Sequence, residues 1–452
     1  MFRNAYLVGG SVRDVILGKP PLDYDIVVTG DPEVFAARIA RQVDGKIVVL
    51  GKERFNLYRI ISDTLSIDVT TAKGNDIESD LGERDFTINA LACDLSNGVI
   101  IDSMAALDDL DNGRIKMVSP AVFRSDPVRL IRAFRMAATL NFKIEPGTLK
   151  KISHQSALIG QAAPERIWNE LDLILACPDS FSTLVEMARS SLLFEVIPEL
   201  RDLKGCEQNR YHTADVFEHT MRAYQTLEAQ LDHPASPLSE NVRRFIAQIP
   251  AQKQVLIKLA ILLHDIGKPA SQSRDGAGHI HFYGHAGRSA SLASGICRRL
   301  RMSSRQQQWI EQVVRYHQRP LSLFLSQKDR PGRPKAVGRF LRQCGGYTPY
   351  ILIHAIADNL SKSPTPASGN PAMINFLAGL LENYLVMDVS AQSPPLINGH
   401  DVMNRFHIEP SPLIGRILSN VEELRLAKSM KSKEEALEWV SRRFETEIRR
   451  GR

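Results

Sequence analysis

Two aspartates and a glycine turn near the N-terminus carry the residue types best suited to chemistry. Residues 9–25 read GGSVRDVILGKPPLDYD, so one residue separates Asp23 from Asp25 at the start of the apolar run IVV. On a β-strand, residues two apart face the same side, where two carboxylates can hold a hard cation such as Mg²⁺. Gly9 and Gly10 open a predicted helix whose unpaired N–H groups and dipole favour a polyphosphate. A phosphate site beside a paired-carboxylate metal site is typical of nucleotidyl or phosphoryl transfer.

A third carboxylate, Asp68, lies in the predicted strand SIDVT. Close to Asp23 and Asp25, it would complete a catalytic site for one or two metal ions. The alternative is a glycine turn followed by two solvated aspartates, with Asp68 facing water at a strand end. The residues by themselves leave both interpretations open.

The segment ERDFTINALA at residues 83–92 carries polar side chains suited to a sugar phosphate. Arg84 and Asp85 precede a predicted amphipathic helix, and Asn89 shares a face with Asp85 because it follows four residues later. Such a helix start beside the metal site would bind a triphosphate and sugar hydroxyls. A capped surface helix without a ligand is the alternative.

The segment RSDPVRLIRAFRMAATLNF, from residue 124, predicts a helix with a basic face. Asp126 and Pro127 have the pattern of an N-cap followed by proline at the first helical position. Arginines recur every three residues, which places them within about a third of the helix circumference: Arg129, Arg132 and Arg135. Guanidinium and carboxylate groups offer complementary hydrogen bonds to nucleobase edges. A solvated basic helix face is the alternative.

The elements that must hold these residues change character near residue 118. Before it, runs rich in β-branched residues such as KIVVLG, RFNLYRII and LSIDVTTA predict strands, and residues 31–45 predict a helix. After it, long apolar periodicity predicts helix after helix, with a boundary at residues 205–210 and a basic Pro/Gly-rich loop at residues 327–339. The sequence therefore predicts an α+β head followed by helical domains.

Composition narrows the class of protein. The 452 residues are 43% hydrophobic and 24% charged, which is ordinary for a globular protein, and no apolar run approaches the ~20 residues of a membrane span. The N-terminal sequence lacks the apolar stretch of a signal peptide, and the five cysteines lack CxxC spacing. We therefore expect reduced thiols and a cytoplasmic protein without a membrane partner. The net charge of +6 is a weak indication of a polyanionic partner.

Over residues 4–175 the chain carries an ordered set of motifs, which are GGSVRD with DYD, then ERDFTINA, then DPVRLIRAFR followed by PERIWNEL. This set resembles the motifs of class II tRNA nucleotidyltransferases and bacterial poly(A) polymerases. The resemblance implies a polymerase β-type nucleotidyltransferase head with a mixed sheet at residues 1–118 and an all-helical neck at residues 119–205. It further implies Mg²⁺-dependent transfer of CMP or AMP from a nucleoside triphosphate to an RNA 3′ hydroxyl. DNA is not an expected partner, and protein side chains rather than a template would select the nucleotide.

The resemblance also implies roles for individual residues. Asp23 and Asp25 would be the Mg²⁺ ligands, and Asp68 the third catalytic carboxylate. Glu165 and Arg166 match a motif that steadies the base-reading helix. The predicted nucleotide-binding residues, from the triphosphate contacts to the base-reading pair, are Gly9, Gly10, Arg13, Arg84, Asp85, Asn89, Asp126, Arg129, Arg132 and Arg135.

The sequence departs from the family pattern in two places. Ser125 precedes Asp126 where the family usually has glutamate, although the Asp and Arg that would pair with the base remain. Between Asp68 and Arg84 the chain reads only VTTAKGNDIESDLGE, which is shorter than the flexible loop usual there. In this family a full loop accompanies the switch from CTP to ATP, so the short segment resembles the CC-adding enzymes. We therefore expect CC addition to the tRNA 3′ end from CTP.

Two other functions stay open. The first is full CCA addition, A addition or poly(A) synthesis, in which ATP would also be a substrate. The second is a non-catalytic RNA-binding or nucleotide-sensing protein. The intact DYD carboxylates argue against that one, because a pure binder has little use for clustered negative charge beside phosphate. The remainder of the chain carries a second candidate site.

Histidines and aspartates recur through the helical region after residue 205. Most single histidines on apolar helices are core or surface residues, but His264 and Asp265 end the apolar helix VLIKLAILLHDIGK, where two polar groups need partners. The order H…HD…H…H…D resembles the HD phosphohydrolase superfamily over about residues 210–360. The predicted ligands are His219, His264, Asp265, His285, His317 and Asp358.

The HD resemblance implies a domain at residues 206–325, with its last ligand near residue 358. Imidazole and carboxylate ligands suit Ni²⁺, Mn²⁺ or Mg²⁺, which would activate water against a phosphoester, with Lys268 contacting the phosphate. HD domains attached to tRNA nucleotidyltransferases imply phosphatase or 2′,3′-cyclic phosphodiesterase activity. An HD domain that keeps its ligands and serves only structure is the alternative.

The remaining residues, 326–452, predict a helical body and tail that bind RNA. Its loop at residues 327–339 carries cations that would meet phosphates without reading sequence: Lys328, Arg330, Arg333 and Lys335, with Arg342 following. A solvated basic loop is the alternative.

Overall fold

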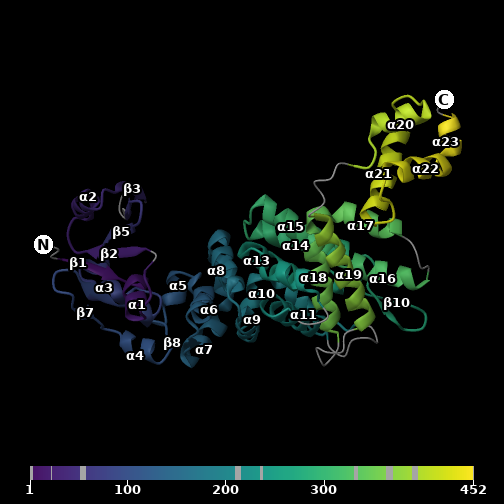
Figure 1. Ribbon diagram of the computed structural model, residues 1–452. Helices are drawn as coiled ribbons and strands as arrows, with labels where there is room; N and C mark the ends of the chain where they lie inside the picture. The colour runs from purple at the N-terminus through teal and green to yellow at the C-terminus, as the bar shows by residue number, and fades with distance from the viewer. Residues whose placement is uncertain are drawn as a thin grey trace. The chain divides into compact units, whose positions relative to one another are not determined.

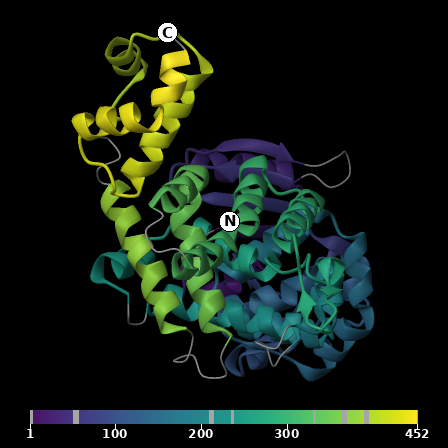
Figure 2. The same cartoon turned by 90° about the vertical axis from the view of Figure 1, so that its right-hand side faces the viewer.

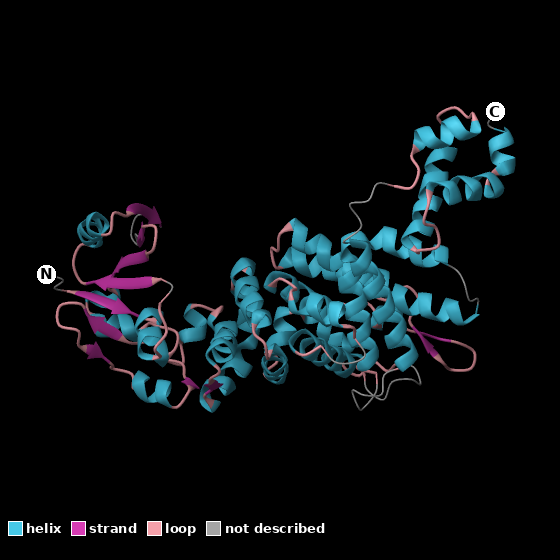
Figure 3. Cartoon of the chain, viewed as in Figure 1, coloured by secondary structure: helices cyan, strands magenta, loops and turns pink. Residues whose placement is uncertain are grey.

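The computed structural model describes residues 4–21, 23–50, 57–208, 215–234, 238–329, 334–362, 370–388 and 395–450. They divide into two compact units, Met1–Ile197 and Pro198–Arg452. The seven-stranded sheet lies in the first unit, whereas the described part of the second is helical apart from the short pair β10 and β11 (Figures 1 and 3). The expected α+β class is confirmed.

The first unit is built on a mixed sheet in the order β3-β4-β5-β2-β1-β6-β7. Only β2 and β5 pair in parallel, and the other neighbours are antiparallel. The strands are β1 (Ala5–Val8), β2 (Tyr24–Val28), β3 (Lys46–Leu50), β4 (Leu57–Ile61), β5 (Ser66–Thr71), β6 (Ala92–Asp94) and β7 (Ile100–Ile101).

Helices bury both faces of this sheet. The helix α2 (Pro32–Gln42), capped by Asp31, packs Ala36, Ile39 and Ala40 against one face. On the other face α3 (Ile77–Gly82) packs Ile77 and Leu81 against β1 and β2. The remaining helices of this part are α1 (Gly10–Ile16) and α4 (Ala106–Asp111), with 3₁₀ turns η1 (Lys73–Asn75) and η2 (Thr87–Asn89).

A helical layer follows within the first unit. The helix α6 packs along α8, and a short parallel pair joins β8 (Arg114–Ile115) to β9 (Lys143–Ile144). The helices are α5 (Val122–Ser125), α6 (Arg129–Leu140), α7 (Pro146–Gln155), α8 (Pro164–Ala176), α9 (Ser180–Arg189) and α10 (Leu192–Val196), with η3 (Ser156–Gln161).

Two local predictions differ from the structure. ERDFTINA forms only the 3₁₀ turn η2, because β6 begins three residues later at Ala92 and the backbone of Phe86 bridges to Met117. The helix α6 begins at Arg129, so Asp126 is not its cap. The carboxylate of Asp126 instead accepts two hydrogen bonds from Arg166 of α8, which a local helix rule does not anticipate.

The second unit is centred on α13 (Ala251–Leu263), whose residues from Val255 to Leu263 are all buried. Around it lie α11 (Val216–Asp232), α12 (Glu240–Ala247), α14 (His285–Arg299), α15 (Ser304–Tyr316), α16 (Arg319–Asp329), α17 (Pro334–Cys344), α18 (Thr348–Leu360) and α19 (Pro371–Asp388). The pair β10 (Ser273–Arg274) and β11 (Ile280–His281) forms a hairpin. Three 3₁₀ turns complete the unit, η4 (Pro198–Leu203), η5 (Pro269–Ser271) and η6 (Gly345–Tyr347).

The last four helices pack around a hydrophobic core of their own, which includes Val402, Ile417 and Val440 (yellow helices in Figure 2). They are α20 (Gly399–Phe406), α21 (Pro412–Leu426), α22 (Lys433–Arg443) and α23 (Glu445–Arg450). The helix α17 lies along α21. Among the described helices, none is by itself long and apolar enough to span a membrane; α12 and α13 meet that test only together, across a bend of 100°.

The predicted loop at residues 327–339 is shorter than expected, because α16 extends to Asp329 and α17 begins at Pro334. Proline at a first helical position and the buried face of α17 explain the earlier start. Arg330 and Arg333 lie outside the described residues. Arg342, considered above as a phosphate contact, pairs at 3.0 Å with the buried Glu423 of α21.

Gly338 is the point of closest approach between α17 and α21. A Cβ at this position would overlap the backbone carbonyl of Glu423, which has no rotamer to move away. We expect Gly338→Ala to destabilise the C-terminal helices by about 2 kcal/mol or more, the scale of overpacking a closed interface. Calorimetry and limited proteolysis measure the effect.

Gly415→Ala is the matched control, because it lies on α21 with open space at its Cβ position. It should leave stability unchanged or raise it slightly, since alanine favours the helix. Equal unfolding temperatures for both variants would contradict the close approach.

Candidate active sites in the two units

A cleft of about 790 Å³ in the first unit collects residues from several segments. The start of α1, the end of β5, the turn η2 and the start of α6 all contribute to its wall. Eight of the predicted site residues line it: Gly9, Gly10, Asp25, Arg84, Asp85, Asn89, Arg129 and Arg132. Asp126 lies in a neighbouring cavity of about 590 Å³, which shares Arg84 and Arg129 with the cleft.

Gly9 shows why the turn into α1 requires glycine. Its φ of 70° is in the left-handed region, and a Cβ there would lie 3.0 Å from Nη1 of Arg84. The Ser11 hydroxyl joins this helix start to β2, because it donates to the carbonyl of Asp23 at 3.0 Å and accepts from the N–H of Asp25 at 3.1 Å. The glycine turn and the carboxylates are therefore held in one unit.

The parallel pairing of β2 with β5 places Asp25 directly opposite Asp68. Burial raises the pKa of Asp25, and the charges of Asp68 and Asp23 add to the rise while Arg84 opposes it. Arg59 of β4 binds both oxygens of Asp68, at 2.8 and 2.7 Å. The crowded negative charge fits a divalent cation held by Asp23 and Asp25, because a cation would relieve the repulsion that raises this pKa.

The polar residues of η2 form a network across the cleft wall. The Asn89 amide donates to Asp85 at 2.8 Å, so the predicted contact exists although the helix does not. Arg13 donates to Asn89 at 2.6 Å and pairs with Asp14, and it does not line the cleft. Arg84 is fixed by Asp80, with Nη2 2.7 Å from the carboxylate.

The expected base-reading residues divide into two groups. Nη1 and Nη2 of Arg166 donate to the two carboxylate oxygens of Asp126, at 3.0 and 2.7 Å. Burial opposes ionisation of Asp126, but these hydrogen bonds hold its pKa below the usual range. Nε of Arg129 is buried without a hydrogen-bond partner among the described residues, 3.9 Å from Asp126. This N–H and the carboxylate beside it are available to a planar polar ligand.

Arg132 and Arg135 instead share one acidic partner. Their Nε atoms lie 2.8 and 2.7 Å from the two oxygens of Glu170, a buried residue of α8. Arg132 also approaches Asp85 at 3.3 Å and lines the cleft, whereas Arg135 does not. Sequence reasoning missed Glu170 and Arg59, because their pairing with residues 35 and 9 positions away has no local signature, and it also missed Asp80, although its i,i+4 spacing to Arg84 is a local one.

The second unit brings its six predicted ligands into one cavity of about 230 Å³. They come from α11, the end of α13, the start of α14, the residue after α15, and α18. Their candidate ligand atoms form two groups, each with all its atoms within 4.8 Å of one another. The first group is His219, His264 and Asp358, and the second is Asp265, His285 and His317.

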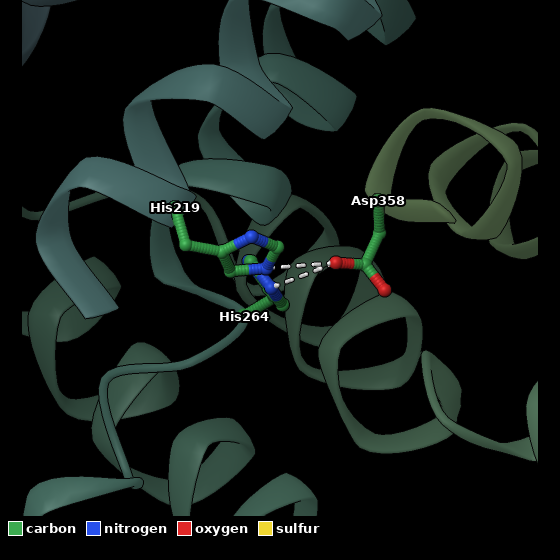
Figure 4. A group of neighbouring side chains, drawn as sticks. All are labelled: His219, His264 and Asp358. Carbon is green, nitrogen blue, oxygen red and sulfur yellow. Dashed lines mark ion pairs between the residues drawn. The ribbon is translucent and has the colours of Figure 1, made fainter. Parts of the chain in front are cut away.

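In the first group both imidazoles point toward one carboxylate (Figure 4). Nε2 of His219 and Nε2 of His264 lie 2.9 and 3.7 Å from Oδ1 of Asp358. Asp265 links the two groups, because Oδ2 lies 3.0 Å from Nε2 of His264 and Oδ1 lies 3.4 Å from Nε2 of His285.

The hydrogen bonds of the histidine rings favour metal binding. Three rings each direct Nδ1 at a backbone carbonyl oxygen: His264 at 2.7 Å, His285 at 2.7 Å and His317 at 2.6 Å. Because a carbonyl oxygen only accepts, each of these Nδ1 atoms must carry the proton. Nε2 is then the lone-pair nitrogen of a ring in its neutral form. Burial opposes a charged His264, but the nearby carboxylates of Asp265 and Asp358 raise its pKa, and a bound metal would take the place of that proton. Burial lowers the pKa of His317 to about 3, which keeps that ring neutral. Nε2 of His264 and of His285 is buried without a hydrogen-bond partner among the described residues. The residues therefore fit a divalent metal ion.

One further histidine escaped the sequence analysis. His354 is buried one helical turn before Asp358, with its ring centroid 5.0 Å from that of His264. Both of its nitrogens lack a hydrogen-bond partner in the described part of the chain. The only signal was the HAIAD spacing, because a lone histidine on an apolar helix usually belongs to the core.

Two cations also border this cavity. Nζ of Lys268 lies 2.7 Å from Oδ2 of Asp265 and 2.8 Å from Oε1 of Gln208. Nζ of Lys362 lies 2.9 Å from Oδ2 of Asp358. Both lysines are positioned by the carboxylates of the ligand groups, and both line the cavity.

Three segments of the chain match known protein families. Residues 5–116 match the poly A polymerase head domain, and residues 141–203 match the probable RNA and SrmB-binding site of polymerase A. Residues 216–363 match the HD domain.

Curated relatives match most of the chain. An A-adding tRNA nucleotidyltransferase of Deinococcus radiodurans is 29% identical over 97% of this chain and 95% of its own length. A CC-adding tRNA nucleotidyltransferase of Synechocystis sp. is 27% identical over 97% and 93%. A multifunctional CCA protein of Nitrosococcus oceani is 33% identical over 75% of this chain and 83% of its own length.

Solved structures share the fold. A complex of a CCA-adding enzyme with ATP aligns with a TM-score of 0.68 at 22% identity, covering 98% of this chain and 90% of that one. The Thermotoga maritima CCA-adding enzyme complexed with tRNA aligns with a TM-score of 0.66 at 21% identity, covering 96% and 90%.

The unpartnered imidazole nitrogens predict that a divalent metal stabilises the second unit. At a free Mn²⁺ or Ni²⁺ concentration about 100 times its Kd, binding should add about 2.7 kcal/mol to the free energy of unfolding. Calorimetry with metal and with EDTA measures the shift, and elemental analysis after gel filtration measures retained metal. His264→Ala should lose both the stability shift and the retained metal. His233 is an exposed histidine at the end of α11, so His233→Ala should keep the shift and the metal. Equal metal content in the two variants would contradict this assignment.

Proposed function

Because this chain belongs to the class II tRNA nucleotidyltransferase and poly(A) polymerase family with an HD domain, we propose that its head adds CMP to the tRNA 3′ end and stops after CC. The substrates are then CTP and a tRNA that lacks its terminal CCA. Relatives that add CC and relatives that add A are about equally similar to it, at 27% and 29% identity. Overall similarity therefore does not choose between them.

The segment between Asp68 and Arg84 is the observation that carries the proposal. After β5 it folds at once into η1 and α3, which is capped by Asp76. Asp80 accepts a hydrogen bond from the backbone N–H of Lys73 at 3.2 Å and also binds Arg84. The segment is thus tied to itself and to the cleft wall. The resemblance associates the switch to ATP with a longer flexible loop at this place, and this chain has a short folded segment there instead.

Within the head, this chain's residues hold and orient the reactants. Asp23 and Asp25 would hold Mg²⁺, which when bound neutralises charge on the leaving pyrophosphate and makes the 3′ hydroxyl more acidic. The 3′ oxygen attacks the α-phosphorus, a new O–P bond forms, the bond to pyrophosphate breaks and the hydroxyl proton leaves. The backbone at Gly10 and the guanidinium of Arg84 would face the triphosphate, whereas the N–H of Gly9 donates to the carbonyl of Leu91 at 3.1 Å and fixes the turn.

Nucleotide selection is assigned to the pair Asp126 and Arg129. Arg166 keeps Asp126 ionised and fixed in orientation, so the carboxylate accepts while Nε of Arg129 donates. This is the pattern that the cytosine edge requires, with one donor and adjacent acceptors. Arg132 and Arg135 also have a packing role, since Glu170 binds both and anchors α6 on α8.

The proposal for the HD domain is metal-dependent hydrolysis of a phosphoester, including a 2′,3′-cyclic phosphodiester at an RNA end. The two ligand groups joined by Asp265 support it, since their imidazole nitrogens and carboxylate oxygens converge within 4.8 Å and two of these nitrogens make no hydrogen bond within the described residues. The bound metal would be Ni²⁺, Mn²⁺ or Mg²⁺ and would supply an activated water. Lys268 and Lys362 line the cavity as cations for the phosphate.

Nucleotide addition to defined tRNA ends tests the head. A tRNA that ends before CCA should gain two residues from CTP, and a tRNA that ends in CC should gain nothing from ATP. Each triphosphate is supplied in a separate reaction, and the lengths of the tRNA products are read on sequencing gels. Addition of A after CC would replace the CC-only proposal by full CCA addition, and a homopolymer of A would indicate poly(A) synthesis. Tight tRNA binding without turnover in Mg²⁺ or Mn²⁺ would favour a non-catalytic binder.

Paired substitutions test whether two independent sites exist. Asp23→Ala with Asp25→Ala should lower CMP incorporation by about 10³-fold, the equivalent of several kcal/mol of lost charge stabilisation, and leave phosphodiesterase activity intact. His264→Ala with Asp265→Ala should do the reverse. Asp63→Ala, an exposed aspartate, is the control for the first pair. A folded double variant that lost both activities would show that the two-site proposal is wrong.

A further inference from the structure

The mouth of the HD cavity carries an aromatic pair that the metal site does not use. The Tyr283 side chain is 77% exposed, an unusual position for a large ring. It stacks on His281, with 5.2 Å between ring centroids and 11° between ring planes. Both residues line the same cavity as the six ligands, and Tyr283 precedes the ligand His285 by two positions.

The hairpin of β10 and β11 holds His281, the inner ring of this pair, in place. Asp275 in its turn accepts hydrogen bonds from the backbone N–H groups of Ala277 and His279, at 3.0 and 2.9 Å. Its other oxygen lies 3.1 Å from Nδ1 of His279 and 3.0 Å from Nε2 of His281. The orientation of the His281 ring is therefore set before any ligand arrives, which lowers the entropy cost of binding against it.

The size of the cavity places the rest of a substrate outside it. At about 230 Å³ it is smaller than the roughly 300–1,000 Å³ of pockets that enclose a small-molecule ligand. It accommodates the phosphoester end of a substrate beside the ligand groups, Lys268 and Lys362. The group attached to that phosphoester must then lie at the mouth, where Tyr283 is exposed.

We propose that His281 and Tyr283 form a stacking platform for a nucleobase, so that the HD domain acts on nucleoside phosphoesters whose base is unpaired. Aromatic side chains bind unstacked bases through their π-faces with little sequence preference, whereas a base inside a duplex has no face to offer. The inference rests on the proposed phosphohydrolase function and specifies its substrate class. It does not extend to aliphatic phosphoesters, which have no ring to stack.

The test compares Tyr283→Ala with the matched variant Tyr283→Phe, which keeps the ring. Full-length protein with Mn²⁺ is given cytidine 2′,3′-cyclic phosphate, a short RNA that ends in a 2′,3′-cyclic phosphate, and glycerol 1,2-cyclic phosphate. The last has the same five-membered cyclic ester without a base. In each case water adds to phosphorus, one P–O bond breaks, and the released oxygen takes a proton.

We expect Tyr283→Ala to raise KM for the base-bearing esters about 5- to 100-fold, the range of one lost base stack, with kcat little changed. KM for the glycerol ester should not change, and Tyr283→Phe should resemble the unchanged protein. A rise in KM for both the mononucleotide and the RNA indicates a platform for any nucleoside. A rise confined to the RNA assigns the platform to an RNA end.

An equal rise for the glycerol ester, or an unchanged KM for the base-bearing esters, would overturn the platform while leaving the phosphohydrolase in place. Absence of hydrolysis of every ester would count against the phosphohydrolase itself. Binding then decides the platform, through calorimetric titration of cytidine 2′-monophosphate into the unchanged protein and both variants. The head is identical in all three, so weaker binding in Tyr283→Ala alone supports the platform, and equal binding in all three overturns it.

Discussion

The parallel pairing of β2 with β5 is the constraint on which the nucleotidyltransferase head depends. It places Asp25 opposite Asp68 and confines negative charge near the start of two central strands of the sheet, where burial and mutual repulsion already raise the pKa of Asp25. Folding makes this cluster costly unless a cation neutralises it, so the same pairing that builds the sheet supports the proposed divalent metal site. The glycine turn is fixed to the cluster through Ser11, so the phosphate site and the carboxylates are positioned together.

Fixed counter-charges complete the head. Arg84, Arg129 and Arg166 surround the cleft and its neighbouring cavity, and acidic or carbonyl partners hold each of them. An arginine held in this way loses little further side-chain entropy when a ligand binds. Glu170 uses the same kind of interaction for stability, because one buried carboxylate binds two guanidinium groups of α6. Ion pairs therefore serve both to position the cleft residues and to pack the helix behind them.

The HD site follows a related rule with hydrogen bonds in place of ion pairs. Backbone carbonyls of Ile261, Phe282 and Val314 each fix the tautomer of one histidine, so the lone-pair nitrogens converge on the carboxylates. The carboxylate of Asp275 in the hairpin turn likewise orients the ring of His281 at the mouth, on which Tyr283 stacks. Both catalytic centres thus consist of groups whose orientation the fold has set in advance, and the ligand or metal completes them.

The sequence by itself determined the α+β class and the order of head and HD motifs, because strand and helix periodicity and motif spacing are local properties. It also named the HD residues that the fold gathers in one cavity, and seven predicted nucleotide-binding residues that the fold gathers in one cleft. Tertiary structure alone decided that Arg59 binds Asp68, that Arg135 turns to Glu170, and that Asp126 meets Arg166 instead of capping α6. These partners are between 9 and 40 residues apart. The identity of a charged residue does not indicate which residue it will pair with. The partner is selected only in the folded chain, which brings distant segments within hydrogen-bonding distance.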